Sequence, residues 1–302
     1  MARFVTKSAG TDPSSLVTAG VVALGILLFT AIVAWPSSAP KVEPPLNAAD
    51  TAIGAKLDDP LTHSFLETLH QVDPEQSRLL HETAEIVLAE GGTAADLALE
   101  IVAIYGINPF KDFEYLAQAD IKYIEKMISL GQSELSALSF AKSKYCQLAT
   151  YEAYDHMQSD AITDELSQAF GYNTRAYKWI LRFGIVQMQA IQDGRSKPKK
   201  YERLNQADTQ DLQESLMRLM QTRALNQLMS QNHRDQQAWK NAAKTMDMCE
   251  IGAEVLAAAN KWPPELKGRV LVEMQRLRKK GAIKALSREL FGDSCGVCTS
   301  IF

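Results

Sequence analysis

This chain lacks the short motifs that identify common enzymes. Its 302 residues contain no glycine-rich phosphate loop, no Gly-x-Ser-x-Gly elbow and no His-Glu-x-x-His pair. Their absence disfavours an enzyme, although catalytic groups that come together only on folding leave no such pattern. A helical hydrolase acting on cell-wall glycan therefore stays open as an alternative.

The sequence also lacks the patterns of β-strands and of glycosylation. No window shows a sustained period-two pattern of β-branched residues, the pattern that predicts a strand. No Asn-x-Ser/Thr acceptor occurs, which fits a bacterial source. From Leu61 onward apolar residues recur at helical spacing, and Asp73 and Asn108 each precede a proline, as at helix starts. We therefore predict an all-α body, either an irregular multi-helix bundle or a short α-solenoid.

The chain is not basic overall. The net charge is −4, which gives no case for binding nucleic acid. The charge is unevenly distributed, because residues 58–120 hold 13 acidic and 2 basic residues, whereas residues 261–289 hold 9 basic and 3 acidic ones. Two solvated faces, or two ends that meet in the fold, account for this pattern. The alternatives are a charged partner or head-to-tail association into a homo-oligomer.

One long apolar run is present, from Leu16 to Trp35, and it contains no charged residue. At 1.5 Å per residue a helix of this length spans about 30 Å, the thickness of the hydrocarbon core. A cleaved signal peptide has a shorter apolar core, and Pro36 and Pro40 follow the best small-residue cleavage positions. We therefore predict a retained transmembrane anchor at 16–35, in preference to a signal peptide or a buried core helix.

The basic residues beside this run predict its orientation. Arg3 and Lys7 precede it, and Lys41 follows it. The positive-inside rule then places residues 1–15 in the cytoplasm as an N-terminal tail. The expected localisation is a single-pass protein of the bacterial inner membrane with its C-terminal body in the periplasm. The inner membrane and other envelope proteins would be its partners.

The rest of the chain divides by composition. Residues 36–60 are rich in proline and predict a linker, and residues 61–291 predict the helical body. A basic turn near 194–207 is a candidate boundary within this body, and residues 292–302 form a tail.

Several helix ends are predicted inside the body. We expect one helix to end at Leu130 and the next to run from Ser133 to about Met157. Asn173 or Thr174 is expected to begin a helix, and Asp208 is expected to cap another.

The C-terminal tail contains Cys295 and Cys298 at Cys-x-x-Cys spacing. Two such thiols form a tight disulfide, exchange electrons or supply half of a metal site. Cys146 and Cys249 each stand alone in a predicted helix, and we interpret both as small buried hydrophobic residues. Outside the cytoplasm these two have the alternative of pairing with each other.

His63, Glu67 and His70 are spaced by four and three residues, which places them on one helix face. Glu67 and His70 match half of a carboxylate-bridged di-iron signature, and no second Glu-x-x-His pair is present. The face is interpreted as a solvated acidic surface, with a metal site as the alternative.

Together these features predict a membrane-anchored helical scaffold, adaptor or accessory subunit of an envelope assembly of the secretion, conjugation or division type. Binding to other proteins would be its activity, and no cofactor is expected, with a metal ion as the alternative. A thiol-redox or metal-handling protein using Cys295 and Cys298 is the second hypothesis.

Overall fold

The computed structural model describes residue 47 and residues 51–106, 112–147, 149–150, 159–222, 226 and 246–279. The predicted anchor at 16–35, the N-terminal tail and the Cys-x-x-Cys tail lie outside these residues. Within the described part of the chain, no helix is both long enough and apolar enough to span a membrane.

The described structure is all-helical, as predicted, and the described residues form no strand beyond one isolated β-bridge. Four helices form its N-terminal part, namely α2 (Ala52–Lys56), α3 (Pro60–Val72), α4 (Pro74–Ala89) and α5 (Ala94–Gly106). Helix α2 lies within the stretch predicted as linker, and its Ile53 is fully buried.

Local chemistry explains where these helices begin. Asp59 and Asp73 each cap a helix, accepting hydrogen bonds from backbone N–H groups of the first turn. In both cases proline follows the cap, where its missing N–H costs nothing and its fixed φ suits a helix. The predicted helix start at Asp73 is confirmed.

The central part consists of α6 (Phe113–Leu116), α7 (Ile121–Phe140), α9 (Ser159–Phe170) and α10 (Arg175–Ser196). Helix α7 runs without interruption through 131–132, so the predicted break between Leu130 and Ser133 is wrong. Thr174 caps α10 as predicted, its hydroxyl accepting a hydrogen bond from the Tyr177 N–H.

The C-terminal part consists of the 3-10 turn η2 (Lys144–Cys146) and of α11 (Gln206–Met220), α14 (Met248–Asn260) and α15 (Pro264–Lys279). Asn205 caps α11, and Asp208 is its reciprocal partner in a capping box. The prediction that Asp208 itself caps this helix was therefore wrong by one turn.

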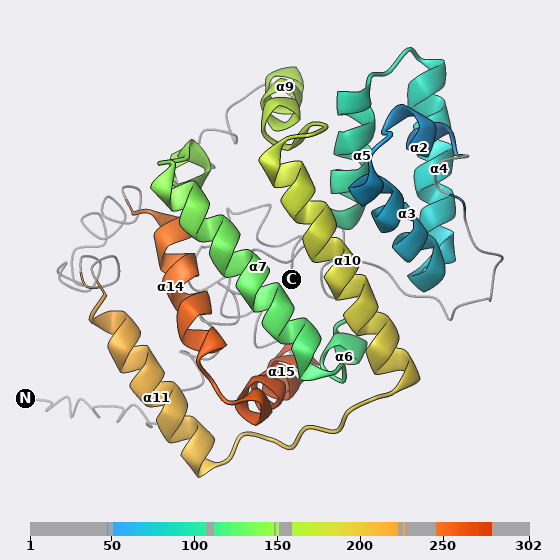
Figure 1. The fold of residues 1–302 in the computed structure, drawn as a ribbon. Coiled ribbons are helices and arrows are strands. Elements are labelled where there is room, and N and C mark those ends of the chain that lie inside the picture. Colours follow the sequence, from blue (N-terminus) through green and yellow to red (C-terminus); the bar gives the residue numbers. More distant parts are fainter. Residues whose placement is uncertain are drawn as a thin grey trace, which may run out of the picture.

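Helix α10 is the central element of the described fold (Figure 1). The N-terminal helices lie along one side of it, with α3 in direct contact, and α7 lies along the other side. Helix α14 packs on α7, and α11 lies at the outer edge beside α14 (Figure 1). Tyr177, Leu181 and Phe183 of α10 are buried in the core formed by these contacts.

The α7–α14 pair packs closely because glycines face leucines. A Cβ on Gly131 would lie 2.9 Å from Cδ1 of Leu256, and one on Gly252 would lie 2.7 Å from Cδ1 of Leu135. Each helix therefore provides one leucine and the small residue that makes room for its neighbour's leucine. This reciprocity fixes the antiparallel register of the pair.

The predicted basic turn begins inside α10 and is tied to the core. Arg195 donates a hydrogen bond to the Val72 carbonyl at 2.8 Å, and its Nη2 lies 2.9 Å from Oδ1 of buried Asp112. Tyr201 donates to the Ala119 carbonyl, and its ring lies against Gly268 of α15. The guanidinium of Arg195 therefore has a structural role, because it connects α10 with the end of α3 and the beginning of α6.

Candidate functional site

The candidate site lies where α7 ends. Lys142 has a φ of 50°, and its N–H donates to the Ser139 carbonyl while the Ser143 N–H donates to the Leu138 carbonyl. These two bonds form a Schellman motif, which turns the chain back from the helix. Residues 144–146 then form the 3-10 turn η2, and this turn places Cys146 in the interior at 1% exposure.

The first turn of α14 supplies the other half of the site. Asp247 caps this helix, its Oδ1 accepting a hydrogen bond from the Glu250 N–H at 2.9 Å. Its Oδ2 accepts one from the Ser139 hydroxyl at 2.7 Å, which links the beginning of α14 to the end of α7. Cys249, in the same first turn, is 5% exposed.

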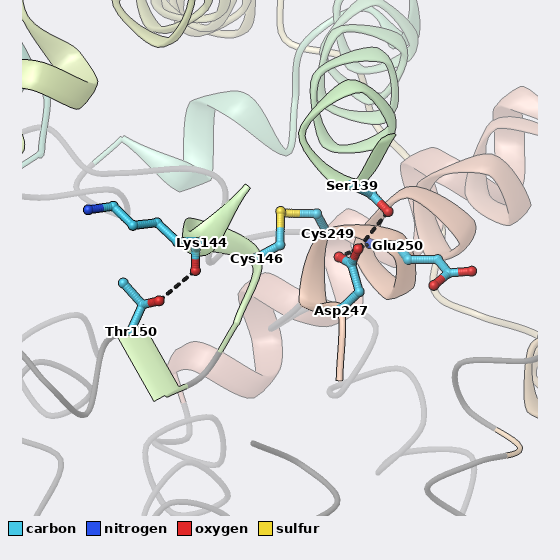
Figure 2. The surroundings of a disulfide bond; sticks show 7 residues. All are labelled: Ser139, Lys144, Cys146, Thr150, Asp247, Cys249 and Glu250. Atoms are coloured by element: carbon cyan, nitrogen blue, oxygen red, sulfur yellow. Dashed lines mark hydrogen bonds between the residues drawn. A yellow bond between two sulfur atoms is a disulfide. The ribbon is translucent and has the colours of Figure 1, made fainter. Parts of the chain in front are cut away.

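Cys146 and Cys249 form a disulfide (Figure 2). Their Cα atoms are 5.0 Å apart, which is within the range of natural disulfides. An antiparallel bridge between Gln147 and Asp247 holds the two segments side by side. Both cysteines are buried, as predicted, and the alternative that they pair with each other is confirmed.

This crosslink spans a long loop. The two cysteines are 103 positions apart in the sequence. In the chain-entropy model, closing a loop of about 100 residues stabilises the folded state by about 4.7 kcal/mol. The disulfide therefore acts as a clasp that holds α14 against α7.

The same residues contain three candidate metal ligands. The sulfurs of Cys146 and Cys249 and a carboxylate oxygen of Asp247 lie within 4.8 Å of one another. A metal requires thiolates, and here the two sulfurs are bonded to each other. Both carboxylate oxygens of Asp247 also accept hydrogen bonds. The group therefore fits a structural disulfide better than a metal centre.

The sequence-predicted histidine face lies on α3. His63 Nε2 is 3.1 Å from the Gly54 carbonyl oxygen and 3.8 Å from Oδ1 of Asp58, while Glu67 is exposed. Among the described residues, the group with convergent metal ligands is the disulfide site and not this face. A metal at His63, Glu67 and His70 stays a prediction.

His81 of α4 lies near this face. Burial lowers the pKa of its imidazole, the neighbouring His70 lowers it further, and Glu85 partly offsets both effects. Its Nε2 is buried and has no hydrogen-bond partner among the described residues. The folded protein therefore favours the neutral form of His81.

The second predicted pair, Cys295 and Cys298, lies outside the described residues. Its redox or metal role stays a prediction.

An apolar cavity of about 50 Å³ lies between α7, α10, α14 and α15. Met127, Phe183 and Trp262 are among the side chains that line it, and Lys267 is the one charged residue in its described lining. The ammonium group of Lys267 bonds to Glu125 at 2.7 Å. An engineered cavity that binds benzene has about 150 Å³, so this one is small for a substrate.

Comparisons with known proteins do not assign the site. The chain matches no family model, and no curated protein or solved structure is significantly similar to it.

Sequence reasoning named the pairing of Cys146 with Cys249 as an alternative but did not prefer it, for a physical reason. The pairing depends on how α14 packs on α7, and spacing along the chain does not encode that distance. The Schellman turn before Cys146 has lysine at its left-handed position, where glycine is usual, so the sequence did not predict this turn either.

Proposed function

We propose that this chain is a membrane-anchored helical binding protein of the bacterial envelope, with its body outside the cytoplasm. The observation that carries the proposal is the disulfide between Cys146 and Cys249. Structural disulfides persist in oxidising compartments and are rare in the cytosol of mesophiles. A body that uses one to join α7 to α14 is suited to the periplasm.

The described surface supports a binding role more than a catalytic one. Its apolar cavity is small, and the one charged residue of its described lining is paired. Leu79, Ile86 and Phe140 are large apolar side chains that lie exposed on helices. Contiguous apolar patches rimmed by polar residues mark protein-interaction sites, and a binding surface that includes some of these side chains is part of the proposal. The role we propose is a scaffold, adaptor or accessory subunit of an envelope assembly, held at the membrane by residues 16–35.

A topology and thiol experiment tests this proposal. Alkaline phosphatase fused after Phe302 should be active, because the enzyme needs the oxidising periplasm. After denaturation without reductant, a thiol-alkylating reagent should leave Cys146 and Cys249 of the wild type unmodified, whereas in a Cys146→Ser control it should modify Cys249. An inactive fusion at normal abundance, together with alkylation of both cysteines, would place the body in the cytoplasm and overturn the proposal.

A further inference from the structure

Two exposed faces of opposite charge lie on different parts of the fold. The first, here called the basic face, consists of the exposed Lys122 and Lys126 on α7, the exposed Arg182 on α10 and the half-buried Lys178 on α10. Helices α7 and α10 are antiparallel, because Trp179 donates to the Leu130 carbonyl and Arg175 donates to Glu134. One helical turn along from Leu130 and Trp179, this register brings Lys126 level with Arg182.

The charges of the basic face are not neutralised within the described part of the chain. None of its four residues forms an ion pair there, in contrast to Lys267, Arg195 and Arg269, which bond to carboxylates. The ammonium group of Lys122 lies over the ring of Tyr123, 4.9 Å from its centroid. Trp179 is partly exposed beside these cations and adds an aromatic surface.

The second, here called the acidic face, is the outward side of α4. Its carboxylates belong to Glu75, Glu82 and Glu85, with Glu90 at the C-cap of the helix, and its cation Arg78 bonds to Glu75 and Glu82. Leu79 and Ile86 lie between these charges and are 40% and 60% exposed. This face therefore combines net negative charge with an exposed apolar centre.

We propose that the acidic face of one copy of this chain docks on the basic face of a second copy. The two faces have complementary charge, and Leu79 and Ile86 would pack on Trp179 and on the aliphatic stems of the lysines. One molecule cannot join its own two faces, because α4 lies at the outer edge on one side of α10 and α7 lies on the other side (Figure 1). A contact between two different faces is heterologous, so repetition gives a ring or a filament.

Anionic lipid headgroups are the main competitor for the basic face. They would account for the cations, but they would leave the exposed leucine and isoleucine among the glutamates of α4 without an occupant. A second copy satisfies both faces at once, and this is why we favour it. The inference requires neither the anchor nor the compartment of the proposed function, so the two can fail separately.

The test is a charge-reversal exchange in the full-length chain, followed by sedimentation velocity in one detergent. The wild-type chain should associate in about 50 mM salt and dissociate in about 500 mM, where the screening length falls from about 14 to about 4 Å. Glu82→Lys with Glu85→Lys should weaken association at least about tenfold, since exposed ion pairs become like-charge contacts. Lys126→Glu with Arg182→Glu should do the same.

Mixing the two reversed chains should restore association, because each then meets an opposite charge on the other. A matched control, Lys142→Glu with Lys261→Glu, changes two exposed lysines outside both faces and should associate like the wild type. Association that is insensitive to all of these substitutions, as self-association through the membrane anchor would be, overturns the proposal. A wild-type chain that stays monomeric at about 100 µM in low salt overturns the proposal. A mixture of the two reversed chains that fails to reassociate also overturns it. The same holds if Lys126→Glu with Arg182→Glu abolishes binding to anionic vesicles and leaves self-association unchanged.

Discussion

Two helix pairs hold the described fold together, and they use different chemistry. Helices α7 and α14 meet through glycine and leucine side chains and are joined by the Cys146–Cys249 disulfide. Helices α3 and α10 bury apolar side chains and add a polar contact, in which the Thr62 hydroxyl bonds to half-buried Asp59 and lies 2.8 Å from the buried Tyr177 hydroxyl. The first pair is distinguished by close packing and a nearby covalent bond, the second by a hydrogen bond between the helices.

The difference predicts different sensitivities. A disulfide responds to reductants and is indifferent to moderate changes of pH. A buried phenol responds to alkaline pH and is indifferent to reductants. Helix α10 belongs to the second pair and packs on α7 of the first, so the two treatments act on different contacts of one connected core. Perturbing the pairs one at a time therefore tests whether they are separate sources of stability.

Breaking the disulfide should have the largest effect. We expect Cys146→Ser with Cys249→Ser to lower the free energy of unfolding by about 3–5 kcal/mol, as for other native disulfides that close long loops. Urea unfolding followed by circular dichroism measures this loss. A reductant should destabilise the wild type by a similar amount and leave the double variant unchanged.

Cys295→Ser with Cys298→Ser is the matched control for this experiment, because it removes two other thiols and leaves the clasp intact. It should respond to reductant like the wild type. If reduction leaves the wild type as stable as before, the clasp does not stabilise the α7–α14 pair.

The α3–α10 pair should show a smaller loss and a pH dependence. Tyr177→Phe removes one buried hydrogen bond and should cost about 1–2 kcal/mol at neutral pH, because Thr62 keeps its bond to Asp59. Burial raises the pKa of Tyr177 above its ordinary value. The unfolded chain therefore loses this proton near pH 10, before the folded chain does, and wild-type stability falls as the pH rises above about 10.

Tyr177→Phe should flatten this alkaline limb, which unfolding titrations between about pH 8 and 11 would measure. Tyr172 and Tyr201 also have raised pKa values, so a part of the limb should remain. Parallel curves for the wild type and the variant would show that the Tyr177 hydroxyl is not the group responsible.

The sequence predicted local features of both pairs and missed what depends on packing. The helix starts predicted at Asp73 and Thr174 are correct, because a helix cap is a local hydrogen bond that short sequence patterns reveal. The break predicted between Leu130 and Ser133 was wrong because Gly131 is a packing residue rather than a helix terminator. The partner that requires this glycine, Leu256, lies on a helix more than 100 residues further along the chain.

The same limit applied to the site. Four cysteines suggested a disulfide or a metal, and Cys-x-x-Cys spacing directed attention to Cys295 and Cys298, whereas the pair that the structure joins is Cys146 and Cys249. The Cys-x-x-Cys spacing can be read from the sequence, whereas the register of α7 against α14 is known only from the folded structure.

Filling the glycines of the α7–α14 pair should have the smallest effect. Alanine is favoured over glycine inside a helix by about 1 kcal/mol, while overpacking a tight contact costs about 1–3 kcal/mol. The contacted atoms, Cδ1 of Leu256 for Gly131 and Cδ1 of Leu135 for Gly252, are the ends of flexible side chains and can yield. We therefore expect Gly131→Ala and Gly252→Ala to destabilise the protein by about 0–2 kcal/mol, with Gly252→Ala the more costly because its contact is closer.

A double-mutant cycle of Gly252→Ala with Leu135→Ala, measured by urea unfolding, should show favourable coupling, since removing the leucine makes room for the new methyl group. Additive costs in that cycle would mean that these two residues do not meet, and the register inferred for the pair would have to be abandoned.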